Sequence, residues 1–245
     1  MTDRRPLITS RANPVVRYVR SLHRRRARYQ ERAFLVEGVT ALRDALEAGG
    51  TPTMVVAASP APSPAVEAIV EPIAASGVPI HRVDPTLFPV ISATETPQGI
   101  LGVFPFPELP LPDFGSHPAL FVVADSLRDP GNLGTLLRSA LGAGADAFFV
   151  TPGTADPYAP KVVRAGATAH FRLPIRAMAW DAPDPAITDC TLRAAADACA
   201  DRAYDETDWT RPACLFVGSE ASGLSENARA MATERVAIPL AGGIE

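Results

Sequence analysis

The chain has 245 residues, a formal net charge of -4 at pH 7 and 47% hydrophobic residues, so it can form one large or two ordinary domains with real cores. It has no apolar run close to the ~20 residues that a membrane helix needs. It also begins without the apolar segment of a secretory signal, which predicts a cytoplasmic protein. The three cysteines (Cys190, Cys199 and Cys214) have no C-x-x-C spacing and the four histidines are scattered, so we expect reduced cysteines and no metal site.

The charge is distributed unevenly along the chain. Residues 1–40 contain ten arginines against three acidic residues, a net charge of +7 that leaves -11 for the remainder. A polyanion such as RNA is therefore expected to bind the N-terminal end.

The first predicted helix begins at Asn13 as N-cap and Pro14 as first helical residue. Apolar residues then recur at spacings of three and four residues, which predicts a helix with one packed face and an outward face that carries arginines. The packed set is Val15, Val16, Val19 and Leu22, and the outward set is Arg17, Arg20, Arg24 and Arg28. Together with Arg25 and Arg26, these arginines are the predicted RNA-binding residues. The alternative is a solvated basic helix that binds nothing.

Short strands and helices alternate through the rest of the N-terminal part, which predicts an α/β domain over residues 1–105. The expected strands are residues 34–38, 53–58, 78–83 and 99–104, and the expected helices are residues 39–48, 65–75 and 85–91. Prolines then recur through residues 106–118, which we interpret as a semi-rigid linker to a second domain at residues 119–245.

The second domain is organised around residues 125–150, a loop and an amphipathic helix between two buried strands, 119–124 and 147–150. Residues 161–168 favour a short helix, which is followed by the strand-like FRLPIR. Residues 191–200 fit a helix or a strand, with strand followed by loop preferred. Residues 215–217 favour a buried strand, and a helix is expected near Ser225. These elements predict a parallel sheet whose carboxyl edge carries the polar loops.

Three ordered motifs occur in this domain. The first is N-x-G-x-x-x-R, formed by Asn132, Gly134 and Arg138; the second is LFVGSEASGLS at residues 215–225; the third is VAIPLAGGIE at residues 236–245. Together they resemble the motifs of the SpoU (TrmH-like) family of RNA ribose 2′-O-methyltransferases, in the SPOUT class. The segments ITSRANP, FLVEG and TPQGILGV resemble, more loosely, the family's small substrate-binding domain.

The resemblance implies an N-terminal L30e-like α/β domain and a C-terminal SPOUT α/β-knot domain with a parallel sheet. It implies S-adenosylmethionine as methyl donor, bound near Gly218, Ile238, Leu240 and Gly242, and a homodimer formed through the C-terminal domain. The segment KVVRAGATAHFRLP has Gly166 where the family usually has serine. The sequence stops at Glu245, where the family continues with a Ser-Leu-Asn segment and a helix. We therefore expect a C-terminally truncated methyltransferase domain without the knot helix.

Arg138, Asn132 and Glu220 are the predicted catalytic residues. The resemblance gives the arginine a central role, often described as general base. Guanidinium groups stay protonated at neutral pH, so stabilisation of an oxyanion and a phosphate is the preferred role. The structural alternative is a pair with a local acid such as Asp146. Asn132 can orient Arg138 or the ribose, and its structural alternative is a helix N-cap. Glu220 can position the ligand or pair with Arg138, and its structural alternative is a place in the cap of the following helix.

The sequence therefore predicts S-adenosylmethionine-dependent 2′-O-methylation of a ribose in structured RNA, with ribosomal RNA as the favoured substrate. The alternative is a non-catalytic RNA-binding or ribosome-assembly protein with a degenerate methyltransferase fold. A dinucleotide-binding Rossmann domain is disfavoured, because GNLG does not supply G-x-G-x-x-G after a strand.

Overall fold

The computed structural model describes residues 6–111 and 118–239, and the chain divides into two compact units. The first unit comprises Met1–Glu108 and Tyr158–Phe171, and the second comprises Leu109–Pro157 and Arg172–Glu245. No helix within the described ranges is long and apolar enough to cross a membrane.

The first unit is built on a four-stranded sheet in the order β1-β4-β2-β3. Its strands are β1 Ala33–Glu37, β2 Met54–Ala58, β3 Ile80–Val83 and β4 Ile100–Pro105. Strand β4 runs antiparallel to β1 and β2, whereas β2 and β3 are parallel. The expected strands of this part of the chain are confirmed.

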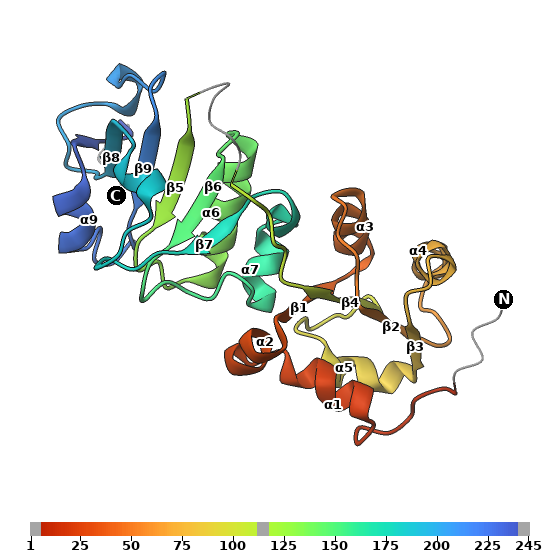
Figure 1. Cartoon of the computed structure of the whole chain (residues 1–245). Coiled ribbons are helices and arrows are strands. Elements are labelled where there is room, and N and C mark those ends of the chain that lie inside the picture. Colours follow the sequence, from red (N-terminus) through yellow and green to blue (C-terminus); the bar gives the residue numbers. More distant parts are fainter. Residues whose placement is uncertain (1–5, 112–117, 240–245) are drawn as a thin grey trace. The chain divides into compact units, whose positions relative to one another are not determined.

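Helices cover both faces of this sheet (Figure 1). One face packs against α3 Val39–Glu47 and α4 Pro64–Ala75, and the other against α1 Pro14–Ser21 and α5 Phe88–Ile91, which follows the short 3₁₀ helix η1 Pro85–Leu87. Alternate residues of each strand therefore enter different cores, which explains why β2 and most of β1 and β4 are apolar on both faces.

The basic N-terminal segment forms two helices, so the prediction of one helix with Arg28 exposed is wrong. Asn13 caps α1 as expected, its Oδ1 accepting from the Val15 backbone N–H at 2.9 Å. The helix ends before Leu22, and α2 spans Arg25–Glu31. Arg28 is only 3% exposed, and its guanidinium donates to the Leu22 carbonyl at 2.7 Å. Burial of this arginine satisfies a carbonyl at the end of α1 that the helix itself leaves without a partner.

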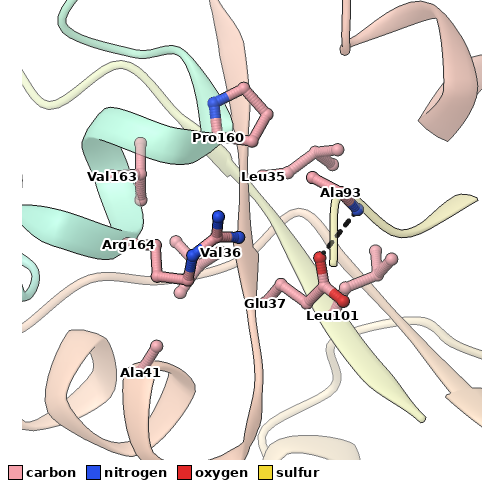
Figure 2. A pocket seen from close by; sticks show the side chains of 9 residues that line it. All are labelled: Leu35, Val36, Glu37, Ala41, Ala93, Leu101, Pro160, Val163 and Arg164. Atoms are coloured by element: carbon pink, nitrogen blue, oxygen red, sulfur yellow. Dashed lines mark hydrogen bonds between the residues drawn. The ribbon is translucent and has the colours of Figure 1, made fainter. Parts of the chain in front are cut away.

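Residues 158–171 pack with the first unit, although the predicted domain boundary assigned them to the 119–245 domain. They contain α7 Pro160–Ala165 and the 3₁₀ helix η2 Ala169–Phe171. Figure 2 shows α7 beside β1, with Pro160 and Val163 near the strand. The ring centroid of Phe171 lies 5.0 Å from that of Phe104. Aromatic packing is therefore the physical reason for this assignment.

The predicted linker begins with residues that belong to the first unit. Phe106 stacks on Tyr158 with ring centroids 3.8 Å apart, so it is part of a packed aromatic cluster. Residues 112–117 of the predicted linker lie outside the described residues.

The second unit is a six-stranded parallel sheet in the order β10-β8-β9-β5-β6-β7. The strands are β5 Leu120–Ala124, β6 Ala147–Val150, β7 Ile175–Ala177, β8 Leu192–Ala196, β9 Ala213–Val217 and β10 Glu234–Val236. Its helices are α6 Pro130–Gly142, α8 Pro185–Thr188 and α9 Glu226–Met231, with a 3₁₀ helix η3 at Tyr204–Glu206. The predicted parallel sheet is confirmed, as is the preference for a strand in residues 191–200.

The strand order places a topological switch point between β5 and β9. From β5 the chain proceeds to β6 and β7 on one side, whereas β9 pairs with β5 on the other. Ligands of open α/β sheets bind at the carboxyl ends of strands where the order reverses in this way. The first and second motifs follow β5 and β9, so both lie at this position.

Candidate functional site

The first motif is presented by the N-terminus of α6. Asp129 is the N-cap, and its carboxylate accepts from the Asn132 backbone N–H at 2.9 Å. Asn132 therefore lies in the first helical turn, and the alternative that Asn132 is itself the N-cap is wrong. Gly134 is buried within α6 and is not a turn residue.

A hydrogen bond joins the first and second motifs across the switch point. Asn132 Nδ2 donates to Glu220 Oε1 at 2.7 Å, although the two residues are 88 positions apart in the chain. Glu220 thus pairs with a residue of the first motif, but with the amide and not with Arg138. Because Nδ2 is used in this bond, Asn132 Oδ1 remains as the hydrogen-bond acceptor that a substrate can use.

Glu220 is held by a tight turn after β9. Ser219 and Gly223 pair as an isolated bridge, with Ser219 N donating to Gly223 O at 3.1 Å and Gly223 N donating to Ser219 O at 2.8 Å. A Cβ atom on Gly218 would lie 2.3 Å from the Gly223 carbonyl carbon, so the backbones approach too closely for any other residue. Gly218 therefore shapes the turn that presents Glu220.

Helix α9 has its own cap, which removes the alternative reading of Glu220 as a capping residue. The Ser225 hydroxyl accepts from the Ala228 backbone N–H at 3.2 Å. The carboxylate of Glu220 is instead engaged with Asn132.

Asp125 connects the loops of this edge, although the motifs in the sequence predict no role for it. It is fully buried (0% exposed) directly after β5. Its Oδ2 accepts from the Ser225 backbone N–H at 2.6 Å, and its Oδ1 accepts from the Thr151 hydroxyl at 3.1 Å. One carboxylate thereby fixes the ends of β5 and β6 and the start of α9. An acidic residue directly after a buried strand is the sequence signal that could have identified it.

Arg138 lies on the exposed side of α6, two residues from the buried Ala140. Within the described ranges its guanidinium makes no hydrogen bond or ion pair. Asp146, the acid considered as its structural partner, accepts from the Leu120 backbone N–H at 2.8 Å. The guanidinium is therefore available to an anionic ligand.

A second feature of this unit is a hollow of about 380 Å³. It is lined by residues at and after β8 and β10, by Leu215 of β9 and by two aromatic side chains: Ala196, Asp197, Ala198, Tyr204, Trp209, Leu215, Val236, Ala237 and Ile238. Ile238 is the one predicted cofactor residue among them. Gly218 does not line the hollow, and Leu240 and Gly242 lie outside the described residues.

The walls of this hollow are mainly apolar, but hydrogen bonds hold two of its sides. Trp209 Nε1 donates to the Tyr204 carbonyl at 2.7 Å. The Asp197 carboxylate accepts from the Cys199 backbone N–H at 2.9 Å and from Arg235 Nε at 3.0 Å. The pKa of Asp197 is lowered, first by the Cys199 hydrogen bond and also by Arg235. Asp197 therefore remains an anion at the rim at neutral pH.

Residues 196–209 are not among the residues predicted for the site. The pattern of residues 191–200 fits a helix as well as a strand, so it does not mark where a strand ends. The available signal was the same as for the other motifs: a polar residue, here Asp197, that follows the last residue of a parallel strand.

The predicted RNA-binding arginines lie on α1, on α2 and between them. Arg28 is buried. The other five are exposed: Arg17, Arg20, Arg24, Arg25 and Arg26. The Arg25 guanidinium carbon lies 5.3 Å from the centre of the Tyr29 ring, which is consistent with a cation–π contact. Among the residues that the structure describes, no three His, Cys, Asp or Glu side chains form a group that could hold a metal ion.

Comparison with known proteins identifies both parts of the chain. Residues 119–245 match the SpoU rRNA Methylase family, and residues 13–102 match the MRM3-like substrate binding domain. The chain is 31% identical to "rRNA methyltransferase 3, mitochondrial" of Homo sapiens, over 89% of this chain and 64% of that protein. It is 30% identical to "23S rRNA (guanosine(2553)-2'-O)-methyltransferase RlmP" of Bacillus subtilis, over 69% of this chain and 63% of that protein. The chain thus spans just under two thirds of the length of each of these relatives.

A solved structure is similar over almost the whole chain. The AdoMet-bound rRNA methyltransferase of Sinorhizobium meliloti has 28% sequence identity and a TM-score of 0.79, covering 98% of this chain and 91% of that one. The SPOUT fold expected from the resemblance is confirmed. The three motifs, the parallel sheet and the family match lead to one conclusion: the chain belongs to the SpoU rRNA Methylase family.

Proposed function

We propose that this protein transfers the methyl group of S-adenosylmethionine to a ribose 2′-hydroxyl of structured RNA, with ribosomal RNA as its substrate. The observation that carries the proposal is the Asn132–Glu220 hydrogen bond, which joins two methyltransferase motifs at the switch point. Arg138, on the same helix as Asn132, supplies the cationic group.

The hollow at the ends of β8 and β10 fits the methyl donor. Its volume of about 380 Å³ lies within the range of small-molecule sites, and its apolar and aromatic walls suit an adenine ring. S-adenosylmethionine, when bound, supplies an electrophilic methyl group. The side chains of Trp209 and Ile238 would exclude water from it, and the backbone after β10 would hold its adenosyl part.

Asn132 and Arg138 act on the RNA. Asn132 Oδ1, held in place by the bond from Nδ2 to Glu220, accepts a hydrogen bond from the ribose hydroxyl and aligns its oxygen for attack. The amide cannot take the hydroxyl proton, so the proton leaves to water as the oxygen gains the methyl group. The Arg138 guanidinium binds the adjacent phosphate and stabilises the negative charge that develops on the oxygen.

Ribose-methylation mapping of total RNA from cells with and without the gene tests the proposal. One ribosomal nucleotide is expected to lose its 2′-O-methyl group when the gene is deleted. An unchanged map, together with RNA binding by a protein that takes no donor, would instead favour the non-catalytic alternative.

Filling the hollow at the end of β8 should weaken donor binding. We expect Ala196→Phe to weaken S-adenosylmethionine binding by roughly tenfold or more, or ~1.4 kcal/mol, in titration calorimetry, because the ring would occupy the hollow. Ala230→Phe, at an exposed position of α9, is the matched control and should bind like wild type. Equal affinity of the two variants would move the donor site elsewhere.

The exposed arginines of α1 and α2 are proposed to contact the RNA backbone. We expect the triple variant Arg24→Gln, Arg25→Gln, Arg26→Gln to weaken RNA binding and to reduce the slope of log affinity against log salt by roughly 2 to 3, since each lost phosphate contact removes ~0.7–0.9. Arg43→Gln, an exposed position of α3 outside the cluster, should leave the slope unchanged. A triple variant with the wild-type slope would show that the phosphates lie elsewhere.

The homodimer through the C-terminal domain and the cytoplasmic location stay predictions. Light scattering of the purified protein tests the first, and fractionation of cells tests the second.

A further inference from the structure

The first unit contains a hollow of about 310 Å³ that the proposed reaction does not use. Three segments meet there that are distant in the chain: FLVEG at residues 34–38, TPQG at residues 96–99 and KVVRAGAT at residues 161–168. Most of the residues that line it have polar side chains, although their apolar stems and the alanine and valine side chains make up much of its surface: Glu37, Gly38, Thr40, Asp44, Thr94, Thr96, Gln98, Arg164 and Thr168, with Ala41, Val163 and Ala167.

Hydrogen bonds to Glu37 make one wall rigid. The carboxylate accepts from the Thr94 hydroxyl at 2.9 Å, from the Ala93 backbone N–H at 3.0 Å and from the Ser92 hydroxyl. Figure 2 shows the bond to Ala93 in the small adjoining pocket, which shares Glu37 and Arg164 with the larger hollow. Glu37 is therefore occupied in holding the wall and is not free to bind a ligand.

Arg164 supplies the positive charge of the hollow. In Figure 2 its side chain extends from α7 toward β1. The residue is exposed, and within residues 6–111 and 118–239 its guanidinium makes no hydrogen bond or ion pair. A guanidinium that lines a hollow without a partner is suited to a phosphate group.

Two further side chains offer groups of different chemistry. Gln98 Oε1 accepts from the Val39 backbone N–H at 2.9 Å, which leaves the amide NH₂ of Gln98 as a donor toward the hollow. Asp44 lines the same hollow and offers carboxylate oxygens as acceptors. Asp44 disfavours a doubly charged anion such as inorganic phosphate, whereas a phosphodiester carries one charge and the ribose beside it carries hydroxyl donors.

The floor of the hollow has an unusual backbone. Ala167 and Thr168 both have positive φ angles, 43° and 62°, although neither is glycine. The buried Thr168 hydroxyl donates to the Ala167 carbonyl at 2.6 Å, which holds this turn in place. The turn directly follows α7, so it fixes the position of the chain next to Arg164.

We propose that this hollow binds one unstacked nucleotide of the RNA, with its phosphate on Arg164 and its ribose or base edge at Asp44 and Gln98. The inference rests on the proposed function, because it takes RNA as the ligand. A volume of about 310 Å³ is at the lower end of small-molecule sites, which suits a single nucleotide and not a duplex. Single-stranded, splayed nucleotides are the part of a structured RNA that proteins read in pockets of this kind.

Amide NMR of the full chain titrated with the ribodinucleoside monophosphates ApA, CpC, GpG and UpU, each of which carries one phosphodiester charge, tests the site directly. We expect shifts at Gly38, Gln98 and Arg164 that Arg164→Gln abolishes and Arg43→Gln, the matched control on α3, leaves intact. If the carboxylate holds the ribose, Asp44→Asn should weaken the binding of ribonucleotides more than the binding of their 2′-deoxy counterparts. Identical shifts with inorganic phosphate alone would overturn the proposal in favour of a general anion site.

Methylation kinetics on ribosomal RNA separate this site from the reaction itself. We expect Arg164→Gln to raise KM for RNA about fivefold or more, ~1 kcal/mol, with kcat unchanged. If wild type methylates RNA and Arg164→Gln changes neither KM nor the nucleotide titration, the nucleotide site is refuted while the proposed function stands. If wild type does not methylate RNA, the proposed function fails, and the titration alone decides whether nucleotides bind the hollow.

Discussion

Replacing Arg138 with alanine is expected to lower the rate of methyl transfer by roughly 10²–10³-fold, which is the cost of removing one group that stabilises a developing oxyanion. The fold should not change, because Arg138 is exposed and the packing of α6 depends on the buried Leu133, Leu137 and Ala140. RNA affinity should fall little, since the five exposed arginines of α1 and α2 are untouched.

Single-turnover kinetics at saturating donor and RNA measure this effect without contributions from product release. Arg172→Ala, an exposed arginine of the same unit, is the matched control and should react at the wild-type rate. Near-normal turnover of Arg138→Ala would refute the assignment of Arg138.

A lysine at position 138 distinguishes the two roles considered for the arginine. Lysine keeps a positive charge but loses the planar fork, so an electrostatic role predicts that Arg138→Lys recovers part of the lost rate at neutral pH. A general-base role predicts a rate that rises with pH as the lysine loses its proton. The pH profile of this variant therefore separates charge stabilisation from proton abstraction.

The local elements of the fold could be predicted because their signals are local. The Asn13 cap, the Ser225 position at the start of α9 and the apolar strands all follow from neighbouring residues. The break between α1 and α2 could not be predicted in this way. It depends on the burial of Arg28 against the Leu22 carbonyl, and the helical spacing of the arginines continues unchanged across it.

The sequence motifs name individual residues of the candidate site, but they do not predict which of these residues contact one another. Asn132, Arg138 and Glu220 were identified from motifs, yet the pairing of Asn132 with Glu220 depends on β9 lying beside β5. Strand order is a property of the whole sheet. The same applies to residues 158–171, whose aromatic side chains find partners in the first unit.

Replacing Gly218 with alanine should damage both stability and activity. The added Cβ would lie 2.3 Å from the carbonyl carbon and oxygen of Gly223 and 2.5 Å from the Leu224 nitrogen, all of which are backbone atoms that cannot rotate away. Overpacking of this kind costs about 1–3 kcal/mol of unfolding free energy. Urea unfolding followed by tryptophan fluorescence measures it, because Trp180 and Trp209 both belong to the second unit.

Replacing Gly142 with alanine is the control, because it should not lower the free energy of unfolding. A Cβ on Gly142 meets no atom within 4 Å, and the residue is the last of α6, so alanine should be neutral or raise stability by up to ~1 kcal/mol.

Gly218→Ala should in addition slow methyl transfer beyond its effect on stability. The turn shaped by Gly218 holds Glu220 against Asn132, and that exposed hydrogen bond orients the Asn132 amide more than it stabilises the fold. A Gly218→Ala protein that unfolds and reacts like wild type would show that the close approach of Gly218 to Gly223 is not required for the site.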